Sequence, residues 1–247
     1  MREFDVAVIG AGPAGSATAI SLASVGHRVV LLDRARFPRD KLCGDFLNPI
    51  SWPVLEDLGV ADAVRECVHV KVLRFRVSAA SGESAGSPLP LRDTLHSGLG
   101  IQRYFLDDVL VTRAKRLGVT VAEGCNVFGI SREKGGWIVS YRGPHGNENR
   151  RARLLVGADG RNSRIARQLK LDAIGTQNHG SIGFQIRLEM ISGLEDSVQV
   201  HQFPGGYAGL VRLDAETVNL CFTLDQSSAG KAISFDLLRK DFLNRNP

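Results

Sequence analysis

The first 33 residues consist of two apolar runs separated by a glycine-rich turn and a stretch of small side chains. Residues 4–9 are mostly apolar and predict a buried strand, and residues 14–25 predict a helix that packs tightly on a sheet. Gly26 ends this helix, and residues 27–32 predict a second strand. We interpret this strand, helix and strand as the unit around which the rest of the chain is organised.

The remaining pattern predicts alternating helices and strands, followed by a region of strands alone. Helical spacing is clearest over 102–117, and shorter or later helices are predicted at 51–58, 61–68 and 234–243. Predicted strands cover 70–78, 119–122, 127–130, 137–141 and 153–158. Residues 81–88 predict a flexible turn, with a return strand beginning at 89–91. Beyond about residue 175, strands at 182–188, 198–203, 209–213 and 218–224 predict an antiparallel sheet.

Gly10, Gly12 and Gly15 follow the first strand directly and open the first helix. We expect Gly10 to permit a tight turn, Gly12 to let the backbone approach a pyrophosphate, and Gly15 to let helix and strand pack closely. The helix begins near Pro13 and Ala14, where unpaired N–H groups favour phosphate binding. The strand before and the helix after make the motif more specific than three glycines alone, although a purely structural turn is the alternative.

Asp33 ends the second predicted strand. Its position suits a carboxylate that accepts hydrogen bonds from a ribose 2′-hydroxyl. Because that carboxylate would repel a 2′-phosphate, the sequence favours an adenosine dinucleotide without one. The long polar loop that follows, residues 34–45, is of a length that is often functional.

Composition narrows the class of protein. The 247 residues are 43% hydrophobic, with a formal charge of +5 and scattered arginines, so we expect a globular protein that does not bind nucleic acid. The four cysteines lie far apart and the six histidines are dispersed, which argues against a metal site and a disulfide framework. No apolar run is long enough for a membrane span and no basic leader precedes the first strand, so we expect a cytoplasmic protein.

Three stretches together resemble the FAD-dependent oxidoreductases of the para-hydroxybenzoate hydroxylase fold, and within it the geranylgeranyl reductase-like branch. They are the unit from Gly10 to Asp33, the loop 37–45, and the Gly-Ala-Asp-Gly run at 157–160 with Ser163. The resemblance covers essentially the whole chain. It implies an α/β fold in which a Rossmann-like FAD-binding domain (1–72 and 99–175) carries an inserted and C-terminal antiparallel substrate-binding sheet (73–98 and 176–247), the latter incomplete.

The resemblance also implies which residues bind FAD. The predicted cofactor-binding residues are Gly10, Gly12, Pro13, Ala14, Gly15, Asp33, Arg34, Cys43, Gly44, Arg103, Asp159 and Gly160. Arg103 would contact the cofactor from the long helix, with a salt bridge to Asp107 as the alternative. Asp159 would hold the pyrophosphate or ribityl region, and the alternative is a turn aspartate that caps the following helix.

Cys43 and Lys41 are the predicted catalytic residues. Flavin reductases of the resembled branch carry a Cys-Gly pair near the isoalloxazine ring, where a thiol can tune or shield the reactive face. Lys41 would stabilise a thiolate or a reduced, anionic flavin. The alternative for Cys43 is a small apolar residue with no chemical role.

One departure from the family pattern concerns a third nucleotide motif, a strand that ends in Gly-Asp-Ala. Nothing after Leu224 matches it, and the Gly44-Asp45 pair lies in the early loop. We therefore expect a truncated chain that lacks part of its cofactor site.

The resemblance predicts a flavoprotein, reduced by NADH or NADPH, that passes hydride to a double bond of a hydrophobic, isoprenoid-like substrate. A lipid-like substrate would also bring the protein into peripheral contact with a membrane. One alternative is a flavin monooxygenase that hydroxylates an aromatic substrate, because fold does not fix chemistry. The other is an inactive nucleotide-binding fragment. The sequence leaves the oligomeric state open.

Overall fold

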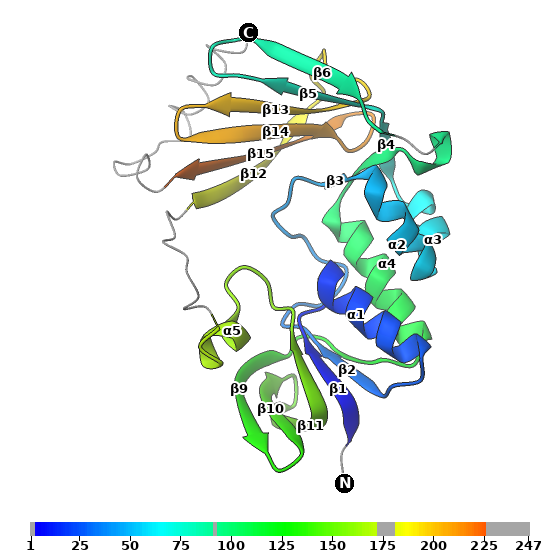
Figure 1. Cartoon of the computed structure of the whole chain (residues 1–247), viewed down its shortest axis with the longest axis vertical. Helices are drawn as coiled ribbons and strands as arrows, with labels where there is room; N and C mark the ends of the chain where they lie inside the picture. The colour runs from blue at the N-terminus through cyan, green and yellow to red at the C-terminus, as the bar shows by residue number, and fades with distance from the viewer. Residues whose placement is uncertain (1–2, 91–92, 172–180, 226–247) are drawn as a thin grey trace. The chain divides into compact units, whose positions relative to one another are not determined.

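The computed structural model describes residues 3–90, 93–171 and 181–225, and it divides the chain into two compact units (Figure 1). The first unit comprises residues 1–40, 53–66 and 104–176, and the second comprises 41–52, 67–103 and 177–247. The domains predicted from the sequence placed 41–52, 67–72 and 99–103 with the nucleotide-binding part. The structure groups these segments with the second unit because their strands pair with one another.

The first unit is built on a six-stranded sheet in the order β8-β2-β1-β11-β10-β9. Its strands are β1 (Phe4–Ile9), β2 (Val29–Leu32), β8 (Thr120–Ala122), β9 (Asn126–Glu133), β10 (Gly136–Gly143) and β11 (Gly146–Gly157). β8, β2, β1 and β11 run parallel, whereas β10 and β9 continue the sheet in antiparallel pairs. β1 and β2 are almost wholly buried, as expected of central parallel strands.

Four helices of the described residues agree with the predicted ones to within a few residues. They are α1 (Pro13–Ser24), α2 (Trp52–Asp57), α3 (Ala61–Glu66) and α4 (Arg103–Arg116). The structure adds the short helix α5 (Arg164–Gln168), which is not among the predicted helical stretches, and short 3-10 turns at Pro49–Ser51 and Thr94–His96. α1 packs on β1 and β2, and Gly26 follows its C-terminal end with a φ of 88°. This packing fixes the glycine-rich turn at the carboxyl end of β1.

The second unit holds a larger sheet and a smaller one. The six-stranded sheet has the order β12-β15-β14-β13-β5-β6, and the three-stranded sheet has the order β3-β7-β4 (Figure 1). The bounds are β3 (Phe46–Leu47), β4 (His69–Val72), β5 (Arg74–Ser78), β6 (Ser84–Pro88), β7 (Gly98–Ile101), β12 (Ser181–Glu189), β13 (Ser197–Phe203), β14 (Gly206–Arg212) and β15 (Thr217–Asp225). The larger sheet therefore joins the inserted and C-terminal segments, as predicted, and one of its pairs, β5 with β13, is parallel.

Several predicted elements differ from the structure, among them β11, which begins at Gly146 rather than at residue 153. The alternating stretch 70–78 is not one strand: β4 pairs with β7, whereas β5 pairs with β6 and β13. Residues 84–88, predicted as part of a turn, form the edge strand β6, whose side chains are all exposed. The predicted helix 234–243 lies outside the described residues.

Within the described part of the chain, no helix combines the length and the apolar character needed to span a membrane.

Candidate functional site: a nucleotide cradle and a polar cluster around Cys43

The turn after β1 is too crowded for side chains at two of its glycines. Gly10 has a φ of 101°, and a Cβ atom there would lie 2.3 Å from the carbonyl oxygen of Ala158, at the end of β11. A Cβ atom on Gly15 would lie 1.7 Å from the carbonyl oxygen of Gly10. Both positions therefore require glycine, because the opposing atoms belong to the backbone.

The first turn of α1 follows this turn directly. Gly12 is the N-cap residue and Pro13 the first helical residue, and no described side chain caps the helix. Pro13 has no backbone N–H group. The first N–H groups at this end of the helix are therefore those of Ala14 and Gly15. Uncapped N–H groups at the end of a twelve-residue helix are suited to a phosphate.

Asp33 ties the second strand to the glycine turn. Its Oδ2 accepts a hydrogen bond from the N–H of Ala11 at 2.7 Å, and its Oδ1 accepts one from Ala35 at 2.8 Å. The structure thus places the carboxylate beside the glycine motif, as the spacing predicted. Arg34, the next predicted cofactor residue, is exposed at the start of the loop.

Asp159 is committed to the start of α5 in this structure. Its carboxylate accepts hydrogen bonds from the hydroxyl of Ser163 and from the backbone N–H groups of Arg164 at 2.7 Å and Ile165 at 3.2 Å. This is the capping role that the sequence left as the alternative. Gly160 follows with a φ of 85° and is exposed.

The part of the loop that belongs to the first unit is anchored by two side-chain contacts. Arg39 Nη2 lies 3.2 Å from Oδ2 of Asp107, a residue of α4 with a fully buried carboxylate. The guanidinium of Arg39 also lies over the ring of Phe37, 4.9 Å from the ring centre. Glu123 accepts hydrogen bonds from the N–H of Phe37 and from Lys115 Nζ. Burial acts to raise the pKa of Glu123, but these two hydrogen bonds lower it below its ordinary value.

Cys43 lies in the second unit, in a polar cluster on β12 and β15. Its N–H donates to Gln185 Oε1 at 3.3 Å, and its carbonyl accepts from Asn219 Nδ2 at 3.1 Å. Asp45, two residues later, is paired with Arg187 at 2.7 Å. The cluster is thus formed by loop residues and by side chains from two neighbouring strands.

Burial raises the pKa of two groups in this cluster, Asp45 and Cys221. Asp45 is 2% exposed, and its desolvation raises the pKa of the carboxyl group, against the opposing effect of Arg187. The pKa of the Cys221 thiol is raised by burial, and the neighbouring Cys43 and Asp45 add to the effect. Asp45 also has a left-handed backbone with a φ of 51°, a conformation that aspartate tolerates better than most residues.

The other predicted residues of this unit lie near the cluster in sequence. Lys41 and Gly44 are exposed, and Arg103 is half-buried. The N–H of Arg103 donates to Asp45 Oδ1 at 3.3 Å, so the backbone of one predicted cofactor residue is held beside the Cys43 loop.

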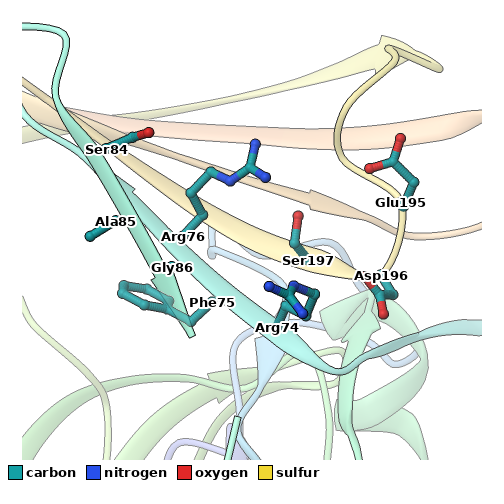
Figure 2. Close-up of a pocket in the computed structure, with 9 residues that line it drawn as sticks. All are labelled: Arg74, Phe75, Arg76, Ser84, Ala85, Gly86, Glu195, Asp196 and Ser197. Carbon is teal, nitrogen blue, oxygen red and sulfur yellow. The ribbon is translucent and has the colours of Figure 1, made fainter. Parts of the chain in front are cut away.

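The six-stranded sheet of the second unit carries the Cys43 cluster on one face and a hollow on the other. It is lined by Arg74 and Arg76 of β5, residues 84–86 of β6, and Glu195, Asp196 and Ser197. In Figure 2, the side chains of Arg76 and Ser197 rise from neighbouring strands on the same side. Because the hollow mixes cations and carboxylates, its charge gives no preference for a ligand.

Comparison with known proteins identifies the family. A family profile described as "FAD binding domain" matches residues 3–204. The chain belongs to this family. The FAD-dependent oxidoreductase family and the mixed α/β fold predicted from the sequence are therefore confirmed.

Three relatives show how wide the family is. Conditioned medium factor receptor 1 of Dictyostelium discoideum is 34% identical over 181 residues, covering 67% of this chain and 35% of the relative. Menaquinone reductase of Mycobacterium tuberculosis is 34% identical over 166 residues, covering 67% and 40%. Digeranylgeranylglycerophospholipid reductase 2 of Methanopyrus kandleri is 31% identical over 211 residues, covering 83% and 50%. The chain thus spans half or less of the length of these three relatives.

A solved structure supports the fold. A myxobacterial FAD-dependent chondrochloren halogenase matches with a TM-score of 0.82 and 23% identity, covering 98% of this chain and 57% of the halogenase. At this identity the likeness concerns the fold alone.

The residues present fit an FAD dinucleotide. Arg39 Nη1 is buried and has no hydrogen-bond partner within the described part of the chain, although a buried guanidinium nitrogen needs an acceptor. Phosphate oxygens are the acceptors that a guanidinium prefers. Arg39 and the uncapped N-terminus of α1 give the first unit hydrogen-bond donors that suit a diphosphate. The carboxylate of Asp33 gives it an acceptor that suits a ribose hydroxyl.

Sequence reasoning missed several residues that the structure brings into these sites. The sequence did not predict the ion pair between Arg39 and Asp107. It also did not predict that Gln185, Arg187 and Asn219 contact the loop that holds Cys43 and Asp45. A weak signal did exist, since Gln185, Arg187 and Asn219 are polar residues within apolar strand patterns. The pattern does not say which loop such residues contact.

Proposed function

We propose that this chain is part of an FAD-dependent reductase that saturates a double bond in an isoprenoid lipid. The observation that carries the proposal is the similarity to two relatives named as reductases of menaquinone and of digeranylgeranylglycerophospholipid. Both names denote reduction of a molecule that carries an isoprenoid chain. The reductase branch that the sequence motifs resemble points the same way.

The chain's own residues are assigned to binding and orientation. In the proposal, the first turn of α1 and Arg39 hold the diphosphate, and Asp33 holds the adenosine ribose. Bound FAD would supply hydride transfer, with NADH or NADPH as the source of electrons. Asp159 would accept a hydrogen bond from the ligand only through its remaining lone pairs, because α5 already occupies part of its carboxylate.

Cys43 is the residue that we assign to the reacting end of the cofactor. Its backbone N–H and carbonyl are held by Gln185 of β12 and Asn219 of β15, which supports this assignment. Lys41 is exposed two residues earlier and would add a positive charge on the same loop. A thiol that shields the flavin from oxygen favours reduction of the substrate over capture of oxygen.

The test is a mass measurement on a defined lipid. The chain is loaded with FAD and incubated without oxygen with NADH or NADPH and a detergent-dispersed geranylgeranyl lipid. We expect the lipid to gain two hydrogens per reduced double bond, and Cys43→Ala to lower the rate by about tenfold, equivalent to about 1.4 kcal/mol in the barrier. Cys67→Ala is the matched control, since Cys67 is a half-buried cysteine outside the cluster.

Three outcomes would contradict the proposal. In a parallel incubation in air, oxygen uptake that is stoichiometric with a hydroxylated product would indicate a monooxygenase. FAD binding without reduction by either nicotinamide nucleotide would indicate a nucleotide-binding fragment without chemistry. An unchanged rate in Cys43→Ala would remove the role assigned to the thiol.

A further inference from the structure

The register of β12 and β15 gathers four polar or thiol side chains on one face of the larger sheet. Gln185 lies directly opposite Cys221, and Arg187 lies opposite Asn219. Residues two apart on a strand share a face, and so do residues directly opposite each other. Phe222, the neighbour of Cys221, instead belongs to an apolar cluster with Ala208 and Leu224. The polar group is therefore confined to the face that meets the Cys43 loop.

Two amides of this group hold both backbone polar groups of Cys43. Gln185 Oε1 accepts from the N–H at 3.3 Å, and Asn219 Nδ2 donates to the carbonyl at 3.1 Å. A loop residue usually satisfies these groups with water or with nearby backbone. Here each contact comes from a different strand, at sequence separations of 142 and 176.

The ion pair between the buried Asp45 and the exposed Arg187 determines which end of each amide faces Cys43. Gln185 Nε2 donates to Asp45 Oδ2 and to Asn219 Oδ1, both at 2.9 Å, so Gln185 Oε1 is left for the N–H of Cys43. Asn219 Oδ1 also accepts from Arg187 Nη1, so Asn219 Nδ2 is left for the carbonyl of Cys43. Each amide is thus oriented by its own hydrogen-bond partners.

We propose that Gln185 and Asn219 are positioning residues that fix the Cys43 thiol, and that the Asp45–Arg187 pair fixes the orientation of their amides. This inference rests on the proposed role of Cys43 in the reductase. It assigns a function to strand residues of the second unit, which act on the reaction through the placement of a loop residue rather than by touching the substrate.

The test measures the reactivity of individual cysteines in the intact chain. Iodoacetamide labelling is followed by peptide mass spectrometry, which gives separate rates for Cys43 and Cys67. We expect Asn219→Leu and Gln185→Met each to raise the Cys43 rate by about tenfold, because one contact to its backbone is lost, and to leave the Cys67 rate unchanged. Gln202→Leu is the matched control, since Gln202 is an exposed amide on β13 of the same sheet.

The ratio of the two rates separates positioning from general destabilisation, which would raise both. A Cys43 rate within twofold of the wild-type value in both variants would overturn the proposal. If the variants do not fold, hydrogen exchange in the wild-type chain tests the proposal instead. Exchange at the Cys43 N–H should be at least about tenfold slower than in an unstructured peptide. Exchange at the unprotected rate would overturn the proposal.

This experiment needs no cofactor or substrate. A negative labelling and exchange result therefore counts against the positioning role and leaves the reductase proposal standing. Absence of lipid reduction, with the labelling result as expected, contradicts the proposed function and leaves the geometry of Cys43 intact.

Discussion

The carboxylate of Asp33 accepts a hydrogen bond at 2.7 Å from the N–H of Ala11, which lies 22 positions earlier in the glycine motif. This contact joins the end of β2 to the turn after β1, so the proposed ribose acceptor and the proposed phosphate donors are held next to each other.

Replacing Asp33 tests this arrangement. Asp33→Ala removes the acceptor for two backbone N–H groups and should lower the free energy of unfolding by about 1–3 kcal/mol. Asp33→Asn should keep most of the stability but weaken FAD binding at least about tenfold, because a charge-assisted acceptor for the ribose is lost. Urea unfolding and FAD titration measure the two effects.

Asp5→Asn is the matched control for Asp33→Asn. Asp5 also accepts a backbone hydrogen bond, from Arg28 at 2.9 Å, but it lies at the opposite end of the β1–β2 pair. Equal FAD affinity in Asp33→Asn and Asp5→Asn would contradict the assignment of Asp33 to the ribose.

A second prediction compares two glycines with similar backbone conformations. Gly10→Ala places a Cβ 2.3 Å from a backbone oxygen, whereas Gly26→Ala, also at positive φ, meets no atom within 4 Å. We expect Gly26→Ala to cost about 1–2 kcal/mol from backbone strain alone. Gly10→Ala should cost about 1–3 kcal/mol more because of overpacking. Equal costs in urea unfolding would mean that the turn after β1 can relax.

The third prediction separates folding from cofactor binding at Arg39. Arg39→Met leaves the fully buried carboxylate of Asp107 without this cation and should lower stability by about 3–5 kcal/mol. The double variant Arg39→Met with Asp107→Leu should recover most of that stability. It should still bind FAD at least about tenfold more weakly than wild type, since the charge-assisted contact is absent. Wild-type affinity in the double variant would show that Arg39 only anchors the loop.

The fourth prediction concerns Tyr141, which is 1% exposed and donates a hydrogen bond to Glu148 at 2.9 Å. Burial, reinforced by that hydrogen bond, raises the pKa of Tyr141 to about 12. The folded state therefore holds the phenolic proton more tightly than the unfolded state, whose pKa is about 10. The stability due to Tyr141 is complete below pH 10 and is lost as the pH rises through about 12.

Absorbance at the tyrosinate band during an alkaline titration checks this prediction. The Tyr141 signal should appear as a late phase, because its pKa is raised to about 12. Tyr141→Phe should abolish the late phase. A late phase that persists in Tyr141→Phe would contradict the raised pKa of Tyr141.

The sequence predicted the elements whose periodicity is clear and local. β1 and α4 were found nearly to the residue, because a buried parallel strand and a long helix each carry an unambiguous pattern. The boundary between β4 and β5 was not visible. Both strands have period two, and the change of partner occurs at Leu73, whose N–H donates to the carbonyl of Asp196 far along the chain.

The candidate site was predictable to the same extent. The glycine motif and Asp33 belong to one β-strand, α-helix, β-strand unit, and their spacing within it was enough to predict that they lie close together. The Cys43 cluster was not predictable, because Gln185 reaches Asp45 across 140 positions and Asn219 reaches Cys43 across 176. Such contacts depend on the register of the larger sheet, which strand patterns do not specify.

The measurement that tests the central claim most directly is the visible absorption spectrum of the purified 247-residue chain after FAD is added and the excess is removed. We predict that the protein retains FAD and shows a bound flavin spectrum, and that Asp33→Ala emerges colourless from the same procedure. A wild-type chain that never retains FAD would contradict the claim that the glycine turn, Asp33 and Arg39 suffice to hold the cofactor.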